Sequence, residues 1–377
     1  MMKNFLYGFM MASTLTFAAC SDDDDDANNI LEGNELNSDI STQVQLDASI
    51  TYKLTGTVNI KNGGKLIIPA GTTIESESGF AGYILVEQGG KIEANGTAAM
   101  PIRFTSSKAT PKAGDWGGII INGYAPISGS TAGTTSATEV DNSKPYGGSN
   151  IADNSGILRY VTIEYSGARS SADIEHNGLT LNGVGNGTTI ENVYILEGSD
   201  DGIELFGGSV NVENLLVVNS DDDMFDFTQG YTGTLSNCYG IWGKTFTSTE
   251  KDPRGIEADG NLDGKGADHV GQSNFKIQNI TLVNNSSYTM DDVVKVRRGA
   301  TATITNALVI GSGPYKDLFD GKDSAGDGNA TTSVAITNSS TGTMSGVQIN
   351  GTFDGVKIEE GHTGCNPALF AWTKYQF

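Results

Sequence analysis

The sequence is poor in cysteine and in basic residues, and each shortage excludes a class of protein. Only 3 of its 377 residues are cysteine, so a disulfide scaffold is excluded. Lys and Arg together number 23 against 45 Asp and Glu, which gives a net charge of −22 at pH 7. Such a surface repels nucleic acid and anionic lipid and attracts cations. We therefore expect no nucleic-acid partner.

Helical periodicity is also missing, and proline is scarce. The chain has 8 Pro and 50 Gly, and Gly, Asn and Thr separate short runs of β-branched residues. This pattern predicts an all-β chain.

A phrase of eight residues is repeated along the second half of the chain. It reads TIENVYIL at 189–196, NVENLLVV at 211–218, TLSNCYGI at 234–241, KIQNITLV at 276–283 and TITNALVI at 303–310. Its Asn recurs at 192, 214, 237, 279 and 306, so the first two steps are 22 and 23 residues and the later ones are 42 and 27. A period of this length indicates a solenoid, in which each coil shares its core with its neighbours.

These strands resemble those of the single-stranded right-handed parallel β-helix. The resemblance implies that the chain has this fold. Stacked coils would place the repeated Asn in one ladder of side-chain hydrogen bonds. We expect the β-helix domain to span 51–377, with surface loops near 128–155 and 244–273. The aromatic stretch NPALFAWTKYQF at 366–377 is expected to cap the open end of the stack.

The first fifty residues predict export. Residues 1–20 form a signal peptide, and their last letters, FAAC, resemble a bacterial lipobox, which implies lipidation of Cys20. The following CSDDDDD resembles the export signal of Bacteroidota surface lipoproteins, so 21–50 would be an acidic export signal and flexible tether. The stretches GDWGGIIINGYAPI and GIEADGN resemble bacterial β-helix lipoproteins of the cell surface. The resemblance implies an outer-membrane, lipid-anchored protein facing the exterior.

The second strand of each coil predicts a column of charged residues. Alternation places Ile203, Phe225 and Ile256 inward, so the residue after each points outward. The predicted column, in contact with solvent, is Glu204, Asp226, Glu257, Lys295, Asp320 and Lys357. One interpretation is a surface charge ladder with little effect on stability.

The other interpretation of the column is a binding or catalytic groove. SDDGIEL and SDDDMFDF resemble phrases of pectate-lyase-type β-helices, which implies calcium held by carboxylates and a basic residue that removes a proton. The catalytic set would then be Glu204, Asp226, Glu257 and Lys295, with Arg254 and Arg297 as other bases. Successive coils would also allow a glycoside hydrolase pair. The paired Asp at 200–201, 222–223 and 291–292 are interpreted as turn residues.

A separate calcium loop is predicted in DGNLDGKGAD, residues 259–268. Asp259, Asn261 and Asp263 occupy positions 1, 3 and 5, and Gly264 allows the sharp turn at position 6. Val270 stands at position 12, where a Glu is usual, so Asp268 is the candidate substitute. The alternative is an ordinary surface turn.

The sequence also contains cysteines, histidines and aromatic residues that could serve a site, and most of them are assigned structural roles. Cys238 is predicted in the core, and its pairing with Cys365 stays open. His176, His269 and His362 show no zinc or triad spacing, so we expect ordinary surface roles. Trp116, Trp242 and Tyr231 are candidate sugar platforms. Asp323, Ser324 and Ala325 resemble a Bacteroidota O-glycosylation site.

The sequence thus leaves two functions open. The first is a non-catalytic surface lipoprotein that binds a glycan or a partner outer-membrane receptor, with calcium. The second is a calcium-dependent polysaccharide lyase, or a glycoside hydrolase, acting on an acidic polysaccharide.

Overall fold

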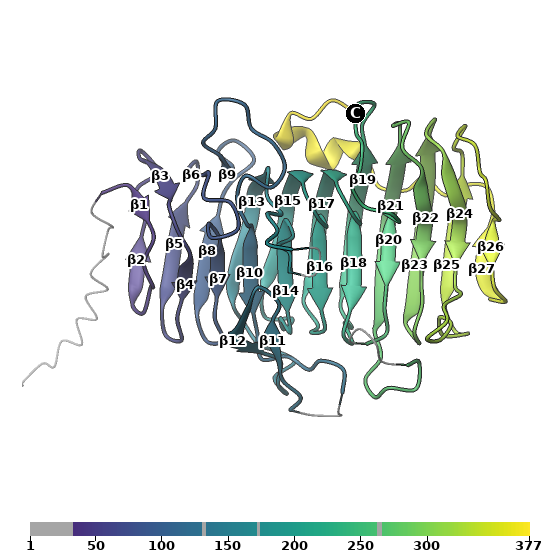
Figure 1. Cartoon of the computed structure of the whole chain (residues 1–377), viewed down its shortest axis with the longest axis horizontal. Helices are drawn as coiled ribbons and strands as arrows, with labels where there is room; N and C mark the ends of the chain where they lie inside the picture. Colours follow the sequence, from purple (N-terminus) through teal and green to yellow (C-terminus); the bar gives the residue numbers. More distant parts are fainter. Residues whose placement is uncertain (1–32, 130–132, 172–173, 262–265) are drawn as a thin grey trace, which may run out of the picture.

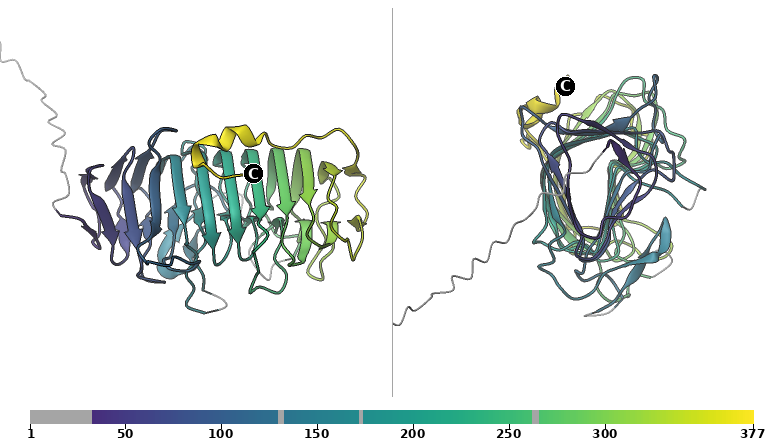
Figure 2. Two further views of the ribbon diagram at one scale, coloured as in Figure 1. Left: turned by 90° about the horizontal axis from the view of Figure 1, so that it is seen from above. Right: turned by 90° about the vertical axis from the view of Figure 1, so that its left-hand side faces the viewer.

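The chain forms a parallel β-helix, which confirms the predicted fold class. The computed structural model describes residues 33–129, 133–171, 174–261 and 266–377. Its coils stack side by side along one axis (Figure 1), and viewed along that axis they superpose in a triangular tube (Figure 2). In these residues no helix has the length and apolar character needed to span a membrane. The predicted signal peptide, Cys20 and the acidic run lie outside the described residues.

Two parallel sheets run the length of the tube. The larger one follows β1 (Glu35–Leu36), β3 (Thr51–Leu54), β6 (Thr73–Ser76), β9 (Ile102–Ser106), β13 (Gly156–Glu164), β15 (Thr189–Gly198), β17 (Asn211–Ser220), β19 (Thr234–Trp242), β21 (Asn274–Asn284), β23 (Thr301–Gly311), β25 (Ser333–Asn338) and β27 (Gly355–Ile358). A branch through β2 (Gln43–Gln45), β5 (Lys65–Pro69) and β8 (Lys91–Asn95) joins it at β13.

The second sheet has shorter strands and supports the candidate site. It follows β4 (Val58–Ile60), β7 (Ile84–Val86), β10 (Ile119–Asn122), β14 (Leu179–Asn182), β16 (Ile203–Phe206), β18 (Phe225–Thr228), β20 (Ile256–Ala258), β22 (Met290–Lys295), β24 (Tyr315–Asp320) and β26 (Ile349–Asn350).

The long strands bend at one residue with positive φ. β13 pairs with β8 before Tyr160 and with β9 after it, so one continuous strand joins two faces of the tube. Tyr160 has φ 49°, and the Asn at the same point of the next coils, Asn192 and Asn214, have φ 54° and 56°. Asn adopts this left-handed conformation more readily than most residues.

The predicted Asn ladder is confirmed. The Nδ2 of each Asn donates to the Oδ1 of the Asn in the preceding coil, at 3.2 Å for Asn214 to Asn192 and 3.0 Å for Asn237 to Asn214. The ladder continues at 3.0 Å for Asn279 to Asn237 and 2.8 Å for Asn306 to Asn279. The ladder therefore gives hydrogen-bond partners to the side-chain amides of the Asn residues whose positive φ forms the bend.

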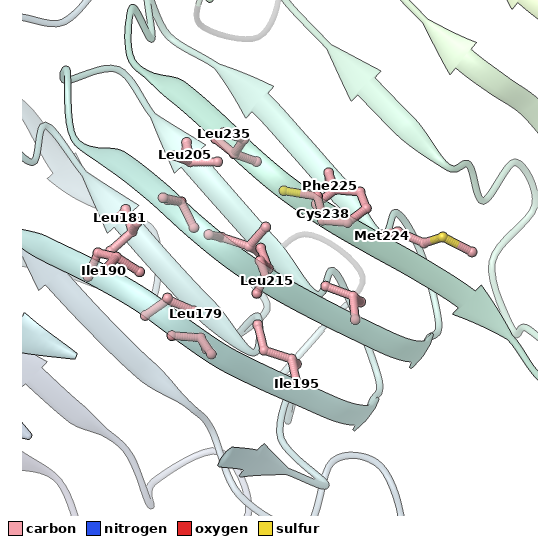
Figure 3. Packing of buried hydrophobic residues seen from close by; sticks show 14 of the residues in the cluster. Leu179, Leu181, Ile190, Ile195, Leu205, Leu215, Met224, Phe225, Leu235 and Cys238 are labelled. Atoms are coloured by element: carbon pink, nitrogen blue, oxygen red, sulfur yellow. The ribbon is translucent and has the colours of Figure 1, made fainter. Parts of the chain in front are cut away.

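The interior of the tube is filled with aliphatic and aromatic side chains. The alternation predicted for the second strands is correct, since Ile203, Phe225 and Ile256 are fully buried. Cys238 also lies in this core, among Leu215, Leu235 and Phe225 (Figure 3). Both Cys238 and Cys365 are buried free thiols, which answers the open question of their pairing.

The predicted boundaries need correction. The first strands, β1 and β2, lie before residue 51, so part of the expected tether belongs to the β-helix. The expected loop near 128–155 contains an antiparallel hairpin, β11 (Ser136–Thr138) and β12 (Asp141–Tyr146). The expected loop near 244–273 contains β20, a regular strand of the second sheet.

The C-terminal aromatic segment is not a cap on the open end, because it folds back along the side of the tube. Its 3₁₀ helix η1 (Pro367–Thr373) lies over the middle of the larger sheet (Figures 1 and 2). Phe370 is fully buried there against Leu216 and Tyr239. The segment therefore packs on aromatic residues of the lateral face and not on the end of the core.

The C-terminal segment also bonds to successive coils on its way back. The amide of His362 donates to Thr337 at 3.0 Å, that of Thr363 to Asn306 at 2.8 Å, and that of Cys365 to Thr281 at 3.0 Å. Further on, Trp372 contacts Tyr160 edge to face. We call residues 359–377 the strap.

Replacing one ladder residue should test the bend and the hydrogen bonds together. We expect Asn237→Ala to lower the free energy of unfolding by about 2 to 4 kcal/mol, since Ala disfavours positive φ and two amide bonds are lost. Urea denaturation would measure the change.

The matched variant Asn237→Gly loses the same bonds but accepts φ 58°. It should therefore cost less than Asn237→Ala. Equal losses would show that the bend makes no demand on this residue.

Candidate functional site

The predicted charged column exists on the second sheet. Glu204 of β16 pairs in register with Asp226 of β18, and Asp226 pairs with Glu257 of β20. Lys295 of β22 and Asp320 of β24 continue the column, again paired in register. Three carboxylates thus occupy successive coils, at a strand spacing of about 4.8 Å.

Two features of the predicted column are wrong. Lys357 lies in β27, which belongs to the larger sheet, so the last coil departs from the pattern. The column does not face open solvent either, because Glu257, Lys295 and Asp320 are 7%, 7% and 5% exposed.

A pocket lies over the Glu204 end of the column. It measures about 500 Å³, and the β11–β12 hairpin forms one wall of it. Phe206, Ile120 and Val140 add apolar surface to this otherwise polar lining. The carboxylates that line it are Glu139, Glu175, Asp200, Asp201, Glu204, Asp222, Asp226, Glu257 and Asp259, together with Arg297.

Two of these carboxylates, Glu257 and Asp259, are neutralised by arginine. Arg254 donates to Glu257 at 2.7 Å and also approaches Asp252 and Asp292 at 2.6 and 3.4 Å. Arg297 forms an ion pair with Glu257 and bonds Asp259 at 2.7 Å. Arg254 and Arg297, considered from the sequence as bases, are therefore held in ion pairs.

Lys295 is also engaged. Its Nζ lies 2.5 Å from a carboxylate oxygen of Asp320 and 3.7 Å from one of Asp292. The side chain therefore neutralises its own neighbours instead of pointing at the pocket, and it is absent from the pocket lining.

Five other carboxylates of the pocket have no such partner among the described residues. They form two groups, Asp200 with Asp201 and Asp222, and Asp201 with Glu204 and Asp226, and within each group the ligand atoms lie within 4.8 Å of one another. We call these residues the acidic cluster. Across the described ranges, none of its members forms an ion pair with Lys or Arg. Asn177 donates to Glu204 at 2.6 Å.

The prediction of turn roles for the paired Asp is correct at two positions. Asp201 accepts the amide of Asp223 at 2.8 Å, and Asp223 accepts the amide of Arg254 at 2.7 Å. These bonds link three successive turns before β16, β18 and β20. They also fix the carboxylates of Asp201 and Asp223 where other acidic groups surround them.

Burial and mutual repulsion raise the pKa values of the acidic cluster. Burial and the charge of Glu257 raise the pKa of Asp222 to about 7. Burial and neighbouring carboxylates raise the pKa of Asp226 and Glu204 well above the usual range. Burial opposes ionisation of Glu257 too, but Arg254 and Arg297 outweigh it and lower its pKa.

The predicted calcium loop at 259–268 is described only in part and stays a prediction. Asp259 accepts hydrogen bonds from Arg297 and Arg298, at 2.7 and 3.2 Å, so its carboxylate is paired with cations of the chain. Asn261 is buried and its amide donates to Gln272 at 3.1 Å. Asp268 is exposed, and Asp263 lies outside the described residues.

The candidate sugar platforms do not lie at the pocket either. Trp116, Trp242 and Tyr231 are at most 1% exposed and pack in the core. His176, expected at the surface, is fully buried, and burial lowers its pKa to about 4. Phe206 could have been found from the sequence, because strand alternation places it on the outer face with Glu204, two residues away. Nothing in the sequence shows that the β11–β12 hairpin faces these two residues.

A second hollow of about 630 Å³ lies beside the first. Gly198, Ser199 and Asp221 line it, whereas the next residues of the same turns, Asp200 and Asp222, line the acidic pocket. The two hollows are therefore neighbours along the turns, and Phe80 and Phe246 also line the second.

The raised pKa of Asp222 predicts a pH-dependent effect of its removal. At pH 3 and below, the group is largely protonated in folded and unfolded chains. From there to about pH 7 the unfolded chain loses its proton first, so stability falls as pH rises. Asp222→Asn should therefore raise the melting temperature at pH 8 by about 2 °C or more and leave it nearly unchanged at about pH 3, with chelator present.

Glu213→Gln is the matched control, because Glu213 is exposed on β17 away from the pocket. It should move neither melting temperature. A loss of stability in Asp222→Asn at pH 8 would show that the carboxylate is favourable where it lies.

Comparison with known proteins places the chain in a family. No curated protein matches it. Two solved structures resemble it, the catalytic domain of a GH87 α-1,3-glucanase in complex with nigerose and a substituted form of that domain, at 12% and 13% identity and TM-scores of 0.33 and 0.32. Each alignment covers 88% of this chain and 61% of the other, so the chain spans about three fifths of their length. The family model described as "Pectate-lyase like beta helix domain" matches residues 38–374. The chain therefore belongs to the pectate-lyase-like β-helix domain family.

Proposed function

We propose that this chain is a surface lipoprotein that binds a glycan in the acidic pocket. The observation that supports it is the pocket itself, about 500 Å³ in volume and lined by carboxylates, amides and hydroxyls beside Phe206. Sugar hydroxyls donate hydrogen bonds to carboxylates, and sugar rings pack on aromatic faces. The size is within the range of small-ligand sites.

The neighbouring hollow supports a polymer as ligand. It shares the turns at 198–201 and 221–222 with the acidic pocket, so a sugar chain could continue from one to the other. The unneutralised carboxylates favour a neutral glycan, because a uronate would meet like charge unless a cation lay between.

The location is part of the proposal and is supported by the sequence. FAAC followed by SDDDDD favours a lipid on Cys20 and exposure on the outer membrane. Cys20→Ala should move the protein from the detergent phase to the aqueous phase in a two-phase extraction. Equal partitioning of both proteins would argue against the anchor.

Glycan binding can be tested with polysaccharides in native gels. In a panel of pectin, alginate, xylan and laminarin, we expect xylan or laminarin, rather than the uronate polymers, to retard the purified chain. Glu204→Gln should weaken the affinity about tenfold by disturbing the bond to Asn177. Glu213→Gln, on the exposed surface of β17, should bind as the unchanged protein. Unchanged mobility on the whole panel would count against the proposal.

A hydrolase is the second candidate, supported by the opposite pKa shifts of Asp226 and Glu257. These carboxyls occupy adjacent coils, where one stays protonated and the other ionised, as a glycosidase acid and its partner require. Release of reducing ends from the same panel would favour this candidate over binding alone. A polysaccharide lyase, which cleaves by elimination, has less support, because its candidate base Lys295 is paired with Asp320.

A further inference from the structure

We propose that the side chains of Lys295 and Asp320 condense into an isopeptide bond, with Asp292 carrying the protons. The product is an amide that joins β22 to β24 and ties two successive coils covalently. The proposal does not depend on glycan binding, and it gives Lys295 a covalent role in the fold.

The three side chains lie within reach of one another. Nζ of Lys295 is 2.5 Å from Oδ2 of Asp320 and 3.7 Å from Oδ2 of Asp292. The strands hold this arrangement, because Lys295 and Asp320 are paired in register. An amine fixed beside a carboxyl group avoids the entropic cost of bringing two reactants together.

Burial favours the amide over the ion pair. Lys295 and Asp320 are 7% and 5% exposed, and Asp292 is fully buried. In the other ion pairs between lysine and a carboxylate in the described ranges, the lysine side chain is at least 15% exposed. Two buried charges are costly even as a pair, whereas an amide is neutral. Condensation therefore removes a cost that the exposed pairs do not have.

The carboxyl group of Asp320 is oriented by the backbone. Its Oδ1 accepts the amide of Lys322 at 2.8 Å, while its Oδ2 faces Lys295. A backbone amide in this position stabilises the negative charge that develops on Oδ1 when the amine attacks the carbon. Oδ2 is then the oxygen that leaves as water.

Asp292 is placed to carry the protons. Burial raises its pKa to about 6, against the opposing charge of Lys295, so the group can both take and give a proton near neutral pH. Its Oδ1 is buried and has no hydrogen-bond partner among the described residues, which leaves a position for that proton.

The step balances without a further reactant. The ammonium group of Lys295 has three protons, of which two pass through Asp292 to Oδ2 of Asp320 and one stays on the nitrogen. The lone pair of Nζ forms the bond to Cγ, the Cγ–Oδ2 bond breaks, and water leaves with the electron pair of that bond. Asp292 ends in the protonation state in which it began.

Trypsin digestion of the purified full chain, denatured first, tests the proposal by peptide mass. Trypsin cleaves after free lysine, so an unlinked chain yields separate peptides 277–295 and 317–322. With the bond, Lys295 resists cleavage, and we expect 277–297 joined to 317–322 in one branched peptide, lighter than their sum by one water. Lys295→Arg, which keeps the charge but not the primary amine, should give no branched peptide. Separate peptides from the unchanged protein would overturn the proposal.

Two controls separate this chemistry from proximity alone. Lys322 lies 2.6 Å from Asp327, but their side chains are 51% and 46% exposed, so cleavage after Lys322 should be complete. Asp292→Asn keeps the shape of the side chain but cannot carry the protons. It should lower the yield of branched peptide about tenfold or more, measured on protein that elutes from gel filtration as the unchanged chain does. Full yield in this variant, or a linked Lys322, would contradict the proposed mechanism.

Discussion

The regular stacking of coils at the strand spacing is the constraint on which the rest of this molecule depends. Inside the tube it aligns like side chains and builds a continuous apolar core. Outside the tube the same alignment brings like charges together, as at Glu204, Asp226 and Glu257. A repeat that favours folding in the interior therefore produces repulsion at the surface, which some other charge has to relieve.

The chain relieves this repulsion in two different ways along one column. From Glu257 onward, Arg254 of the same coil and Arg297 and Lys295 of neighbouring coils form ion pairs with the carboxylates. Toward Glu204 the described residues offer amides and backbone donors but no paired cation. A protein selected only for stability would gain by replacing such carboxylates, since unpaired buried charges are costly. Their presence beside a hollow is therefore the strongest sign of function in the molecule.

The sequence predicts what repeats and misses what occurs once. The Asn ladder, the inward residues and the register of Glu204 with Asp226 follow from a local period, so the sequence alone was sufficient for them. The β11–β12 hairpin, which converts an open face into a pocket, depends on contacts between segments far apart in the chain.

The same limit applies to two assignments of residues that occur once. Trp116 seemed suited to a sugar platform by residue type, but it follows an irregular stretch in which alternation gives no direction, and it is buried. The loop of 259–268 has suitable spacing for calcium, but spacing does not reveal that Arg297 arrives from the next coil and pairs with Asp259.

The strap changes how the solenoid holds together. In a simple stack each coil contacts only its neighbours, so the last coils can fray one at a time. Here the final residues return past Thr337, Asn306 and Thr281 and reach the aromatic surface of the middle coils. The strap therefore ties the last coils to the middle of the stack as well as to their neighbours. Fraying of the last coils then requires the strap to detach first, so these contacts protect the C-terminal half of the tube from proteases.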